Sequence, residues 1–286
     1  MDISQPRIAI RERTLLEIFD LTLHVYRDHW KNILTMLLIN ALPLTIANGV
    51  VCHVLHGDRS SLPIELWINL FLIASQAQIG TLLITQYLGT ALFSGKPTVR
   101  QTVRDFLRVS KSWIWNHGFL RMVVPIFCFV ALLHNNSISL VIMLLLIGLM
   151  VRAFRPFISE ILILEKPPRK IPKDSSLPGI TLKRRVKDLH RGDVVAGFFM
   201  SCVIGSCLLI TVTSLFFHVD TAMGLNGAWD SPIHYVYWPL AAWLVASFLA
   251  VFRFLYYINT RITQEGWEIS LKLMAEKQKL LAEDEY

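Results

Sequence analysis

The chain alternates between long apolar runs and shorter charged segments. Four runs, at residues 32–57, 66–95, 194–219 and 231–252, contain no Asp, Glu, Lys or Arg. A fifth apolar stretch, at 113–157, is interrupted by polar residues near its middle. A helix needs roughly 20 apolar residues to cross a bilayer, so the four runs predict one span each and the fifth predicts two. The expected fold is all-α, a polytopic membrane helix bundle with six transmembrane helices at about 32–55, 66–91, 113–134, 138–158, 194–217 and 236–258.

Two segments outside these spans have the pattern of amphipathic helices. Residues 1–31 contain a capping-box pattern, Thr14 to Glu17, followed by apolar and charged residues at helical spacing. We expect this segment to be a cytoplasmic interfacial helix that lies on the membrane. A second amphipathic segment follows Pro97 and carries a basic stripe, made of Arg100, Arg104, Arg108 and Lys111. We expect this segment to lie on the membrane as well.

Of the two remaining cytoplasmic segments, one is expected to be a loop and the other a helix. Residues 159–193 contain several prolines and a basic run, and are predicted to be a cytoplasmic loop. Residues 259–286 are predicted to form a cytoplasmic tail helix, because apolar residues recur along them at helical spacing. No boundary between soluble domains is indicated, so residues 1–286 are interpreted as a single membrane domain.

Composition and charge placement support this interpretation. Apolar residues make up 53% of the chain and charged residues 17%, and the mean hydropathy is +0.48. Of the 28 Lys and Arg residues, 26 fall in the two terminal segments and in alternate connecting segments. Because cytoplasmic segments retain Lys and Arg, both termini are predicted to be cytoplasmic in an inner membrane. The same bias, with attraction to anionic lipid headgroups, explains the net charge of +7 without nucleic acid.

Inside the spans, polar residues and small residues predict how the helices pack. Five amides in the first two spans would be unpaired in hydrocarbon, so we expect them to face the bundle interior and to bond across helices. They are Asn40, Asn48, Gln76, Gln78 and Gln86. Small residues also recur every fourth position, for example at Gly197, Ser201 and Gly205. Such a face lets helix backbones approach closely.

Arg121 lies within the third predicted span, and Arg152 lies at a similar depth in the fourth. One interpretation is that both side chains extend to the cytoplasmic interface and anchor a short helical hairpin. The other is an anion or lipid-headgroup pocket formed by Arg121, Arg152 and Arg155, with Glu160 as the balancing carboxylate. These four residues are the candidate ligand-binding residues of the sequence.

Histidines gather at the predicted outer face. His53, His56, His218 and Asp220 could supply ligands to a zinc or copper ion. Their spacing matches no closed zinc motif, and neutral imidazoles are compatible with an outer face for other reasons. We therefore predict no metal site and no cofactor, and keep these four residues as weak metal-ligand candidates.

The segment after the last span carries a compact polar motif. Arg261 and Glu265 are one helical turn apart and can pair, Gly266 follows them, and Trp267 suits a membrane interface. The tail is interpreted either as a helix that folds back on the membrane or as a docking helix for a cytoplasmic partner.

Four sequence segments resemble a broad group of bacterial membrane proteins related to the membrane domain of glycerophosphoryl diester phosphodiesterases. The segments are R-T-L-L-E-I-F-D-L-T-L-H-V-Y-R at 13–27, Y-L-G-T-A-L-F at 87–93, R-P-F-I-S-E-I-L-I-L-E at 155–165, and R-I-T-Q-E-G-W-E at 261–268. The resemblance implies a bacterial six-helix bundle. The catalytic barrel of that family is absent from this chain, so the resemblance implies no catalytic residue.

The sequence favours a non-catalytic function. No H-E-x-x-H, G-x-S-x-G, Walker or G-x-G-x-x-G motif occurs, and no Asp or Glu lies within a predicted span, as a coupled transporter usually requires. We expect a scaffold or assembly subunit with a membrane or cytoplasmic protein partner and with anionic lipids around it. The alternative is a transporter or lipid-handling protein, and an intramembrane enzyme is the third possibility.

Overall fold

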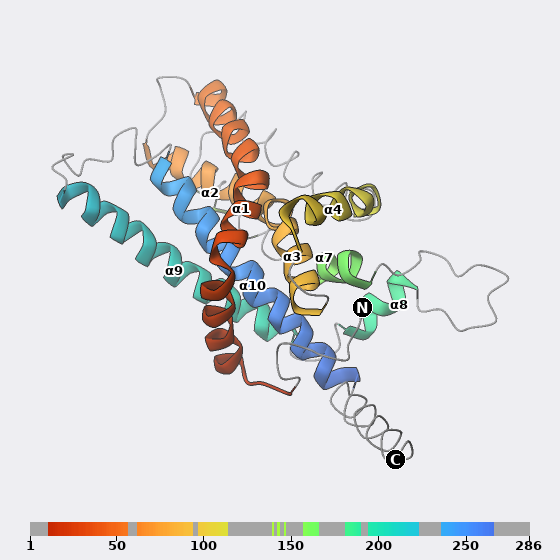
Figure 1. Ribbon diagram of the computed structural model, residues 1–286. Helices are drawn as coiled ribbons and strands as arrows, with labels where there is room; N and C mark the ends of the chain where they lie inside the picture. Colours follow the sequence, from red (N-terminus) through yellow and green to blue (C-terminus); the bar gives the residue numbers. More distant parts are fainter. Residues whose placement is uncertain are drawn as a thin grey trace, which may run out of the picture.

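The computed structural model describes residues 11–56, 62–93, 97–113, 157–165, 181–189, 194–222 and 236–265, with isolated positions between 139 and 146. Within these ranges every regular element is helical and no strand occurs. The elements are α1 (Leu15–His56), α2 (Leu62–Gly80), α3 (Leu82–Phe93), α4 (Val99–Trp113), α7 (Ile158–Glu160), the π-helix η3 (Ile161–Glu165), α8 (Leu182–Leu189), α9 (Val194–Ala222) and α10 (Trp238–Glu265) (Figure 1). The expected all-α class is confirmed for this part of the chain.

Four helical stretches are long and apolar enough to cross a membrane. They are Leu15–Val51, Trp67–Ala91, Gly197–Val219 and Trp238–Glu265, and they match the first, second, fifth and sixth predicted spans. The predicted spans at 113–134 and 138–158 lie almost entirely outside the described residues. The membrane character of the chain is thus supported, and the count of six spans stays a prediction.

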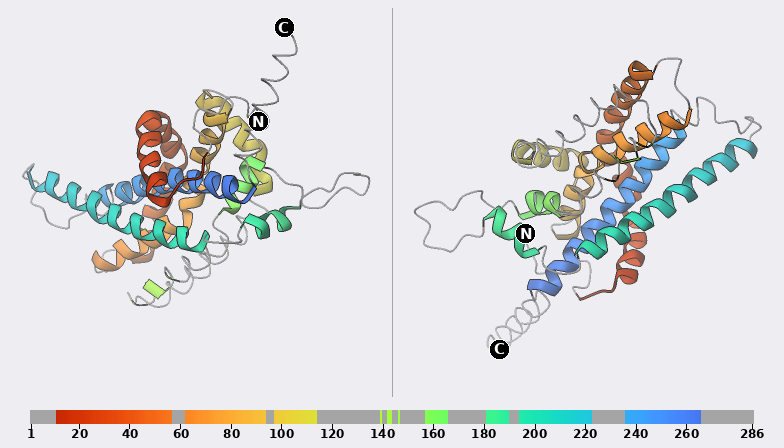
Figure 2. Two further views of the ribbon diagram at one scale, coloured as in Figure 1. Left: turned by 90° about the horizontal axis from the view of Figure 1, so that it is seen from below. Right: turned by 180° about the vertical axis from the view of Figure 1, so that it is seen from behind.

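The central helix of the described bundle is α10. It packs against α1, α2, α3 and α9, and both views in Figure 2 show α9 running beside it. Val251, Phe252 and Phe254 of α10 are almost fully buried. They join buried residues of α1 and α3 in the largest hydrophobic cluster, so the last predicted span holds the bundle together.

The predicted capping box begins α1. The Thr14 backbone N–H donates to Glu17 Oε2 at 2.8 Å, and the Glu17 N–H donates to Thr14 Oγ1 at 3.4 Å. From Leu15 the helix continues for 42 residues to His56, a length of about 63 Å at 1.5 Å per residue. The predicted interfacial helix and the first predicted span are therefore one continuous helix.

The apolar stripe of the first turns of α1 packs against protein. Ile18 and Val25 are buried, the Phe19 ring lies 5.7 Å from the Phe248 ring of α10, and Tyr26 is hydrogen-bonded to Ser247 at 2.9 Å. These residues of the stripe therefore pack against α10, whereas Trp30 at its end is 50% exposed. Contact of the stripe with the membrane stays a prediction. An amphipathic pattern reports that an apolar face is covered, but not what covers it.

The second predicted span is broken in its middle. The helices α2 and α3 are separated at Thr81, whose N–H donates to the Ala77 carbonyl while its own carbonyl accepts from both Ile84 and Thr85. The Thr81 hydroxyl also donates to the Ala77 carbonyl, at 2.7 Å. Such a break in a span is tolerated where protein surrounds it, and Thr81 is 1% exposed.

Three of the five predicted interior amides bond across helices. Asn48 of α1 and Gln76 of α2 exchange two hydrogen bonds, of 2.9 and 2.8 Å. Asn40 donates to the carbonyl of Ile79 at 3.1 Å, next to the break. Gln78 and Gln86 are buried as well. The expectation that these amides face the interior is confirmed.

The helix α9 approaches α10 through its small residues, and the other described residues leave its remaining faces uncovered. A Cβ atom on Gly197 would meet the Tyr256 ring at 2.3 Å, and one on Gly205 would meet Leu249 Cδ1 at 2.7 Å. The predicted close-packing face is therefore confirmed at both glycines. Within an 18-residue apolar stretch of each helix, here called its apolar window, only 6% is buried in α9, against 61% in α10.

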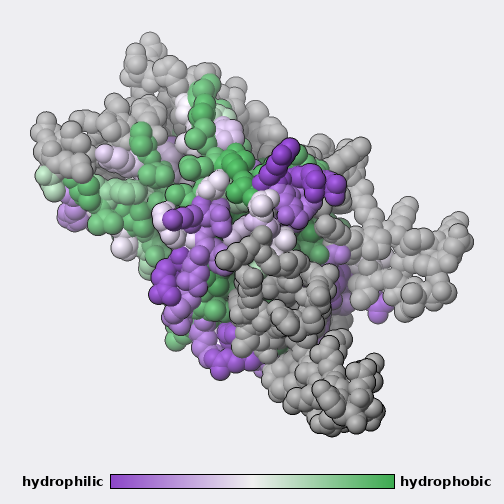
Figure 3. Space-filling view, in the orientation of Figure 1, coloured by the Kyte–Doolittle hydropathy of each residue, from purple (hydrophilic) through white to green (hydrophobic). Residues whose placement is uncertain are grey.

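The basic amphipathic helix after Pro97 is α4. Val99, Val103 and Phe106 on its apolar side pack against the hydrophobic clusters, whereas its arginines are exposed. Figure 3 shows polar surface over α4 and over the first turns of α1, and apolar surface over α9. Part of the apolar side of α4 is thus covered by protein, but Leu107 on the same side is 63% exposed, and contact of this helix with the membrane stays a prediction.

Two parts of the predicted loop at 159–193 are helical. α7 and η3 cover 158–165, with Glu160 and Ile161 fully buried, and α8 covers Leu182–Leu189. At the other end of the chain, α10 continues without a break from the last predicted span to Glu265. These segments meet at one end of the bundle and form the site described next.

Candidate functional site

Three arginines and three glutamates lie where α7, η3 and α8 meet the C-terminal half of α10. Their side chains are between 0% and 22% exposed, and their formal charges cancel. The six residues, here called the charge cluster, are Glu160, Glu165, Arg185, Arg253, Arg261 and Glu265.

Glu165, the last residue of η3, is the centre of the larger half of the charge cluster. Its carboxylate accepts hydrogen bonds from Arg185, one of them at 2.9 Å from Nη2. The Tyr257 hydroxyl donates to the same carboxylate, and Arg261 Nη1 lies 3.2 Å from its Oε1 atom. One carboxylate therefore has three partners from two helices.

Glu265 closes this half into a ring. Its Oε1 atom lies 2.5 Å from Arg185 Nη1, and its Oε2 atom accepts from Arg261 Nη2 at 2.8 Å and Nε at 3.1 Å. Arg185 and Arg261 thus each contact the same two carboxylates, so the two positive and two negative charges balance. A buried ion pair is tolerated when its charges and hydrogen bonds are satisfied in this way.

The electrostatics of the ring keep Arg185 ionised. Burial alone would lower the pKa of its guanidinium, but the hydrogen bonds and negative charges of Glu165 and Glu265 outweigh burial and raise the pKa above its usual value. A group with a raised pKa above the physiological range exchanges no proton there. Arg185 therefore carries a fixed positive charge in the ring.

Arg253 and Glu160 form a separate pair. Arg253 Nε donates to Glu160 Oε1 at 2.5 Å, and the Glu160 side chain is 0% exposed. Two buried polar atoms of this pair have no hydrogen-bond partner, Nη2 of Arg253 and Oε2 of Glu160. Buried groups of this kind are rare and call for an explanation.

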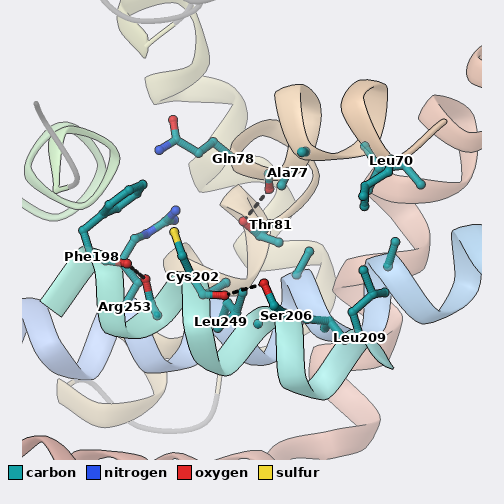
Figure 4. Close-up of a pocket in the computed structure, with 18 residues that line it drawn as sticks. Leu70, Ala77, Gln78, Thr81, Phe198, Cys202, Ser206, Leu209, Leu249 and Arg253 are labelled. Atoms are coloured by element: carbon teal, nitrogen blue, oxygen red, sulfur yellow. Dashed lines mark hydrogen bonds between the residues drawn. The ribbon is translucent and has the colours of Figure 1, made fainter. Parts of the chain in front are cut away.

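Arg253 also lies at one end of a groove between α2, α9 and α10. The groove has a volume of about 260 Å³ and is open along one side. Figure 4 shows Arg253 beside Phe198 and Cys202 at one end and Leu70 and Leu209 at the other. Most of the wall is apolar and much of it is made of small side chains, Ala77, Ser201, Gly205, Ala242, Ala246 and Ala250.

Each carboxylate of the charge cluster contacts an arginine of the same cluster, and one oxygen of Glu160 has no hydrogen-bond partner. In the part of the chain that the structure describes, no three His, Cys, Asp or Glu residues are placed to hold a metal ion. His218 is exposed on α9, while the side chains of His53, His56 and Asp220 lie outside the description.

The structure brings together some of the predicted site residues. Glu160 is in the charge cluster, but its partner is Arg253. The arginines predicted to surround it, Arg121, Arg152 and Arg155, lie outside the described residues.

The predicted pair Arg261 and Glu265 forms and belongs to the ring. Gly266 and Trp267 lie beyond the described end of α10. The predicted ion pair is therefore confirmed, and the role of the tail motif stays a prediction.

Sequence reasoning missed Glu165, Arg185 and Arg253 as site residues. Glu165 follows Glu160 by five residues, the spacing of a π-helical turn, and η3 covers the residues up to it. Two acidic residues at this spacing among apolar residues could have predicted that both glutamates lie on one buried face of the helix. Arg185 had no such signal, because it belongs to a basic run in a predicted loop.

Comparisons of the sequence with models of known protein families and with curated proteins, and of the structure with solved structures, find no match. The resemblance to the membrane domain of glycerophosphoryl diester phosphodiesterases stays a prediction.

Proposed function

We propose that this protein is a non-catalytic multi-pass membrane protein that serves as a scaffold or assembly subunit, with α9 as the face that receives a partner. The observation that carries the proposal is that the described residues leave most of α9 uncovered. This helix has the length and hydropathy of a membrane span, yet 6% of its apolar window is buried. Phe199, Val203 and Ile210 on one side of it are 54%, 58% and 70% exposed.

The contacts inside the bundle favour a scaffold over a transporter. A transporter needs polar groups that are free to line a path, whereas Asn48 and Gln76 are bonded to each other. The charged groups beside α10 are likewise paired in the charge cluster. Together these contacts favour a packed bundle whose exposed apolar residues, on α9 and also on α1, suit association with a second membrane helix.

The test is site-specific photo-crosslinking in intact membranes. A benzophenone side chain at Val203 or Ile210 should give one discrete protein adduct, and the same protein should co-purify with the unmodified chain in mild detergent. Leu42 of α1 provides the matched control, because it is also apolar and 51% exposed but lies on a different helix. If α9 and Leu42 give the same lipid adducts and no discrete protein adduct, the scaffold proposal is wrong.

A further inference from the structure

The outer side of α4 carries positive charge that the described carboxylates balance only in part. Arg100, Arg104 and Arg108 recur every fourth residue, and all three are exposed. Arg108 lies 3.9 Å from Asp105, with side chains that are 70% and 31% exposed, and such a pair is weak. The described residues place no carboxylate within ion-pair distance of Arg100 or Arg104. The surface of α4 is thus positive, whereas the charge cluster is neutral.

An open hollow lies against the first two turns of α4. Its volume is about 470 Å³, and it is lined by four exposed polar residues, Thr98, Arg100, Gln101 and Arg104. Two guanidinium groups that border one hollow can both approach an anionic group placed in it. A phosphate suits this position, because its oxygens match the donor geometry of a guanidinium.

The packing of α4 determines which residues accompany these arginines on the outer side. Three apolar residues pack inward against the hydrophobic clusters, namely Val99, Val103 and Phe106. Leu107 is 63% exposed instead, and helical spacing puts it beside Arg100 and Arg104, which precede it by seven and three residues. A basic surface with an adjoining large apolar side chain is typical of a helix at the boundary between lipid headgroups and acyl chains.

The preceding helices hold α4 close to a membrane. The stretch Trp67–Ala91 has the length and hydropathy of a span, and α4 begins eight residues after it, at Val99. α4 also packs against α3, the second half of that stretch (Figure 1). Basic residues next to the end of a span attract anionic lipid headgroups, so a lipid surface is the anionic partner within reach of these arginines.

We propose that the arginine face of α4, made of Arg100, Arg104 and Arg108, binds the headgroups of anionic phospholipids in the surrounding membrane. Leu107 contacts the upper part of the acyl chains, and the lipid phosphates accept hydrogen bonds from the guanidinium groups. The contact holds α4 against the surface of one leaflet. The proposal goes beyond a scaffold role and is independent of it, because it concerns α4 rather than α9.

The test variant combines Arg100→Gln, Arg104→Gln and Arg108→Gln, which removes the charge and leaves the buried side of α4 unchanged. The matched control removes as many exposed positive charges from the N-terminal part of the chain, by Arg11→Gln, Arg27→Gln and Lys31→Gln. Two of these control positions are paired with a nearby carboxylate, of Glu17 and Asp28. The comparison therefore separates the arginine face from the net charge of the chain.

The probes are dioleoyl phosphatidylglycerol and dioleoyl phosphatidylcholine that carry the same photoreactive group near the top of one acyl chain. Each full chain is reconstituted with both lipids in equal amounts and illuminated, and adducts on residues 97–113 are quantified by mass spectrometry. The unchanged chain and the control should favour phosphatidylglycerol. The test variant should lose at least about fivefold of this preference, the factor for one basic residue near a membrane surface.

Two further measurements do not depend on the test variant. Raising the salt concentration from about 0.1 M to about 1 M shortens the screening length from about 10 Å to about 3 Å, so it should also reduce the preference of the unchanged chain. Asp105→Asn removes the only acidic residue of α4 and should strengthen the preference.

Circular dichroism shows whether each variant keeps its helix content, and only folded variants are compared. The same adduct ratio in the unchanged chain and in the test variant would overturn the proposal. An equal loss in the control would assign the preference to net charge, and a preference that salt does not change would exclude an electrostatic contact. Polyglutamate that binds the purified chain through these arginines, without any preference for phosphatidylglycerol, would assign the face to an acidic protein partner and overturn the lipid assignment.

Discussion

Replacing Glu165 by Ala should destabilise the protein strongly. Glu165 accepts hydrogen bonds from Arg185 and Tyr257 and pairs with Arg261, and its side chain is 13% exposed. Removing one partner of a buried ion pair costs about 3–5 kcal/mol, because the other charge stays buried and unpaired. The slight exposure of the ring favours the lower end, so we expect a loss of about 3 kcal/mol in the free energy of unfolding.

Asp188→Ala is the matched control for this experiment. Asp188 also pairs with an arginine of α8, Arg184, but at 4.0 Å and with side chains that are 76% and 46% exposed. Exposed pairs of this kind contribute about 0–1 kcal/mol to the free energy of unfolding, so Asp188→Ala should lower it by no more than that. Both variants can be measured by equilibrium unfolding in mixed micelles of a mild detergent and sodium dodecyl sulfate.

A second variant separates the loss of the pair from the burial of a lone charge. Glu165→Leu combined with Arg185→Leu leaves Arg261 and Glu265 as a balanced pair, so the double variant should be more stable than the sum of the two single changes predicts. Residues that share one ion-pair network typically couple by about 0.5–3 kcal/mol. Additive effects, or a Glu165→Ala variant as stable as Asp188→Ala, would refute the account of the charge cluster as a buried network.

Three further predictions concern helix contacts and can be measured in the same unfolding assay. Asn48→Leu should lower the free energy of unfolding by about 0.6–1.7 kcal/mol, the range for hydrogen bonds between membrane helices. Adding Gln76→Leu should lower it little further, because the amide left without a partner is removed. A second loss as large as the first would contradict the reciprocal hydrogen bonds. Gly197→Leu should cost about 1–3 kcal/mol by overpacking against α10, whereas Gly49→Ala, with open space around it, should change stability by less than about 0.5 kcal/mol; equal effects would contradict the close approach. Thr14→Ala should cost about 0.5–2 kcal/mol and speed amide hydrogen exchange in the first turn of α1, and unchanged exchange there would contradict the capping box.

The features that sequence reasoning predicted correctly are those with a local or obligatory cause. The capping box at Thr14 depends on residues three positions apart. The inward orientation of Asn40 and Asn48 follows because hydrocarbon cannot satisfy an amide, whatever the partner is. The small-residue face of α9 follows because glycines at this spacing permit close approach. Each prediction needed only residue types and helical spacing.

The features that were missed depend on which distant residues meet. Arg253 and Glu160 are 93 residues apart, and nothing in either local pattern identifies the other. The break at Thr81 lies inside a continuous apolar run, which predicts one straight span. The sequence of α4 could not show that Val99, Val103 and Phe106 pack on protein, because a pattern of hydrophobic spacing is the same for a helix packed on lipid and a helix packed on protein.

The order of residues in the charge cluster also fixes when it can form during synthesis. Glu160, Glu165 and Arg185 leave the ribosome before α10. The arginine that pairs with Glu160 lies on α10, as does one of the two arginines that pair with Glu165. Until α10 is in place, Glu160 is an unpaired acid in a segment that becomes fully buried. The complete cluster can therefore form only after α10 has been synthesised, which makes its assembly a late step in the folding of the described bundle.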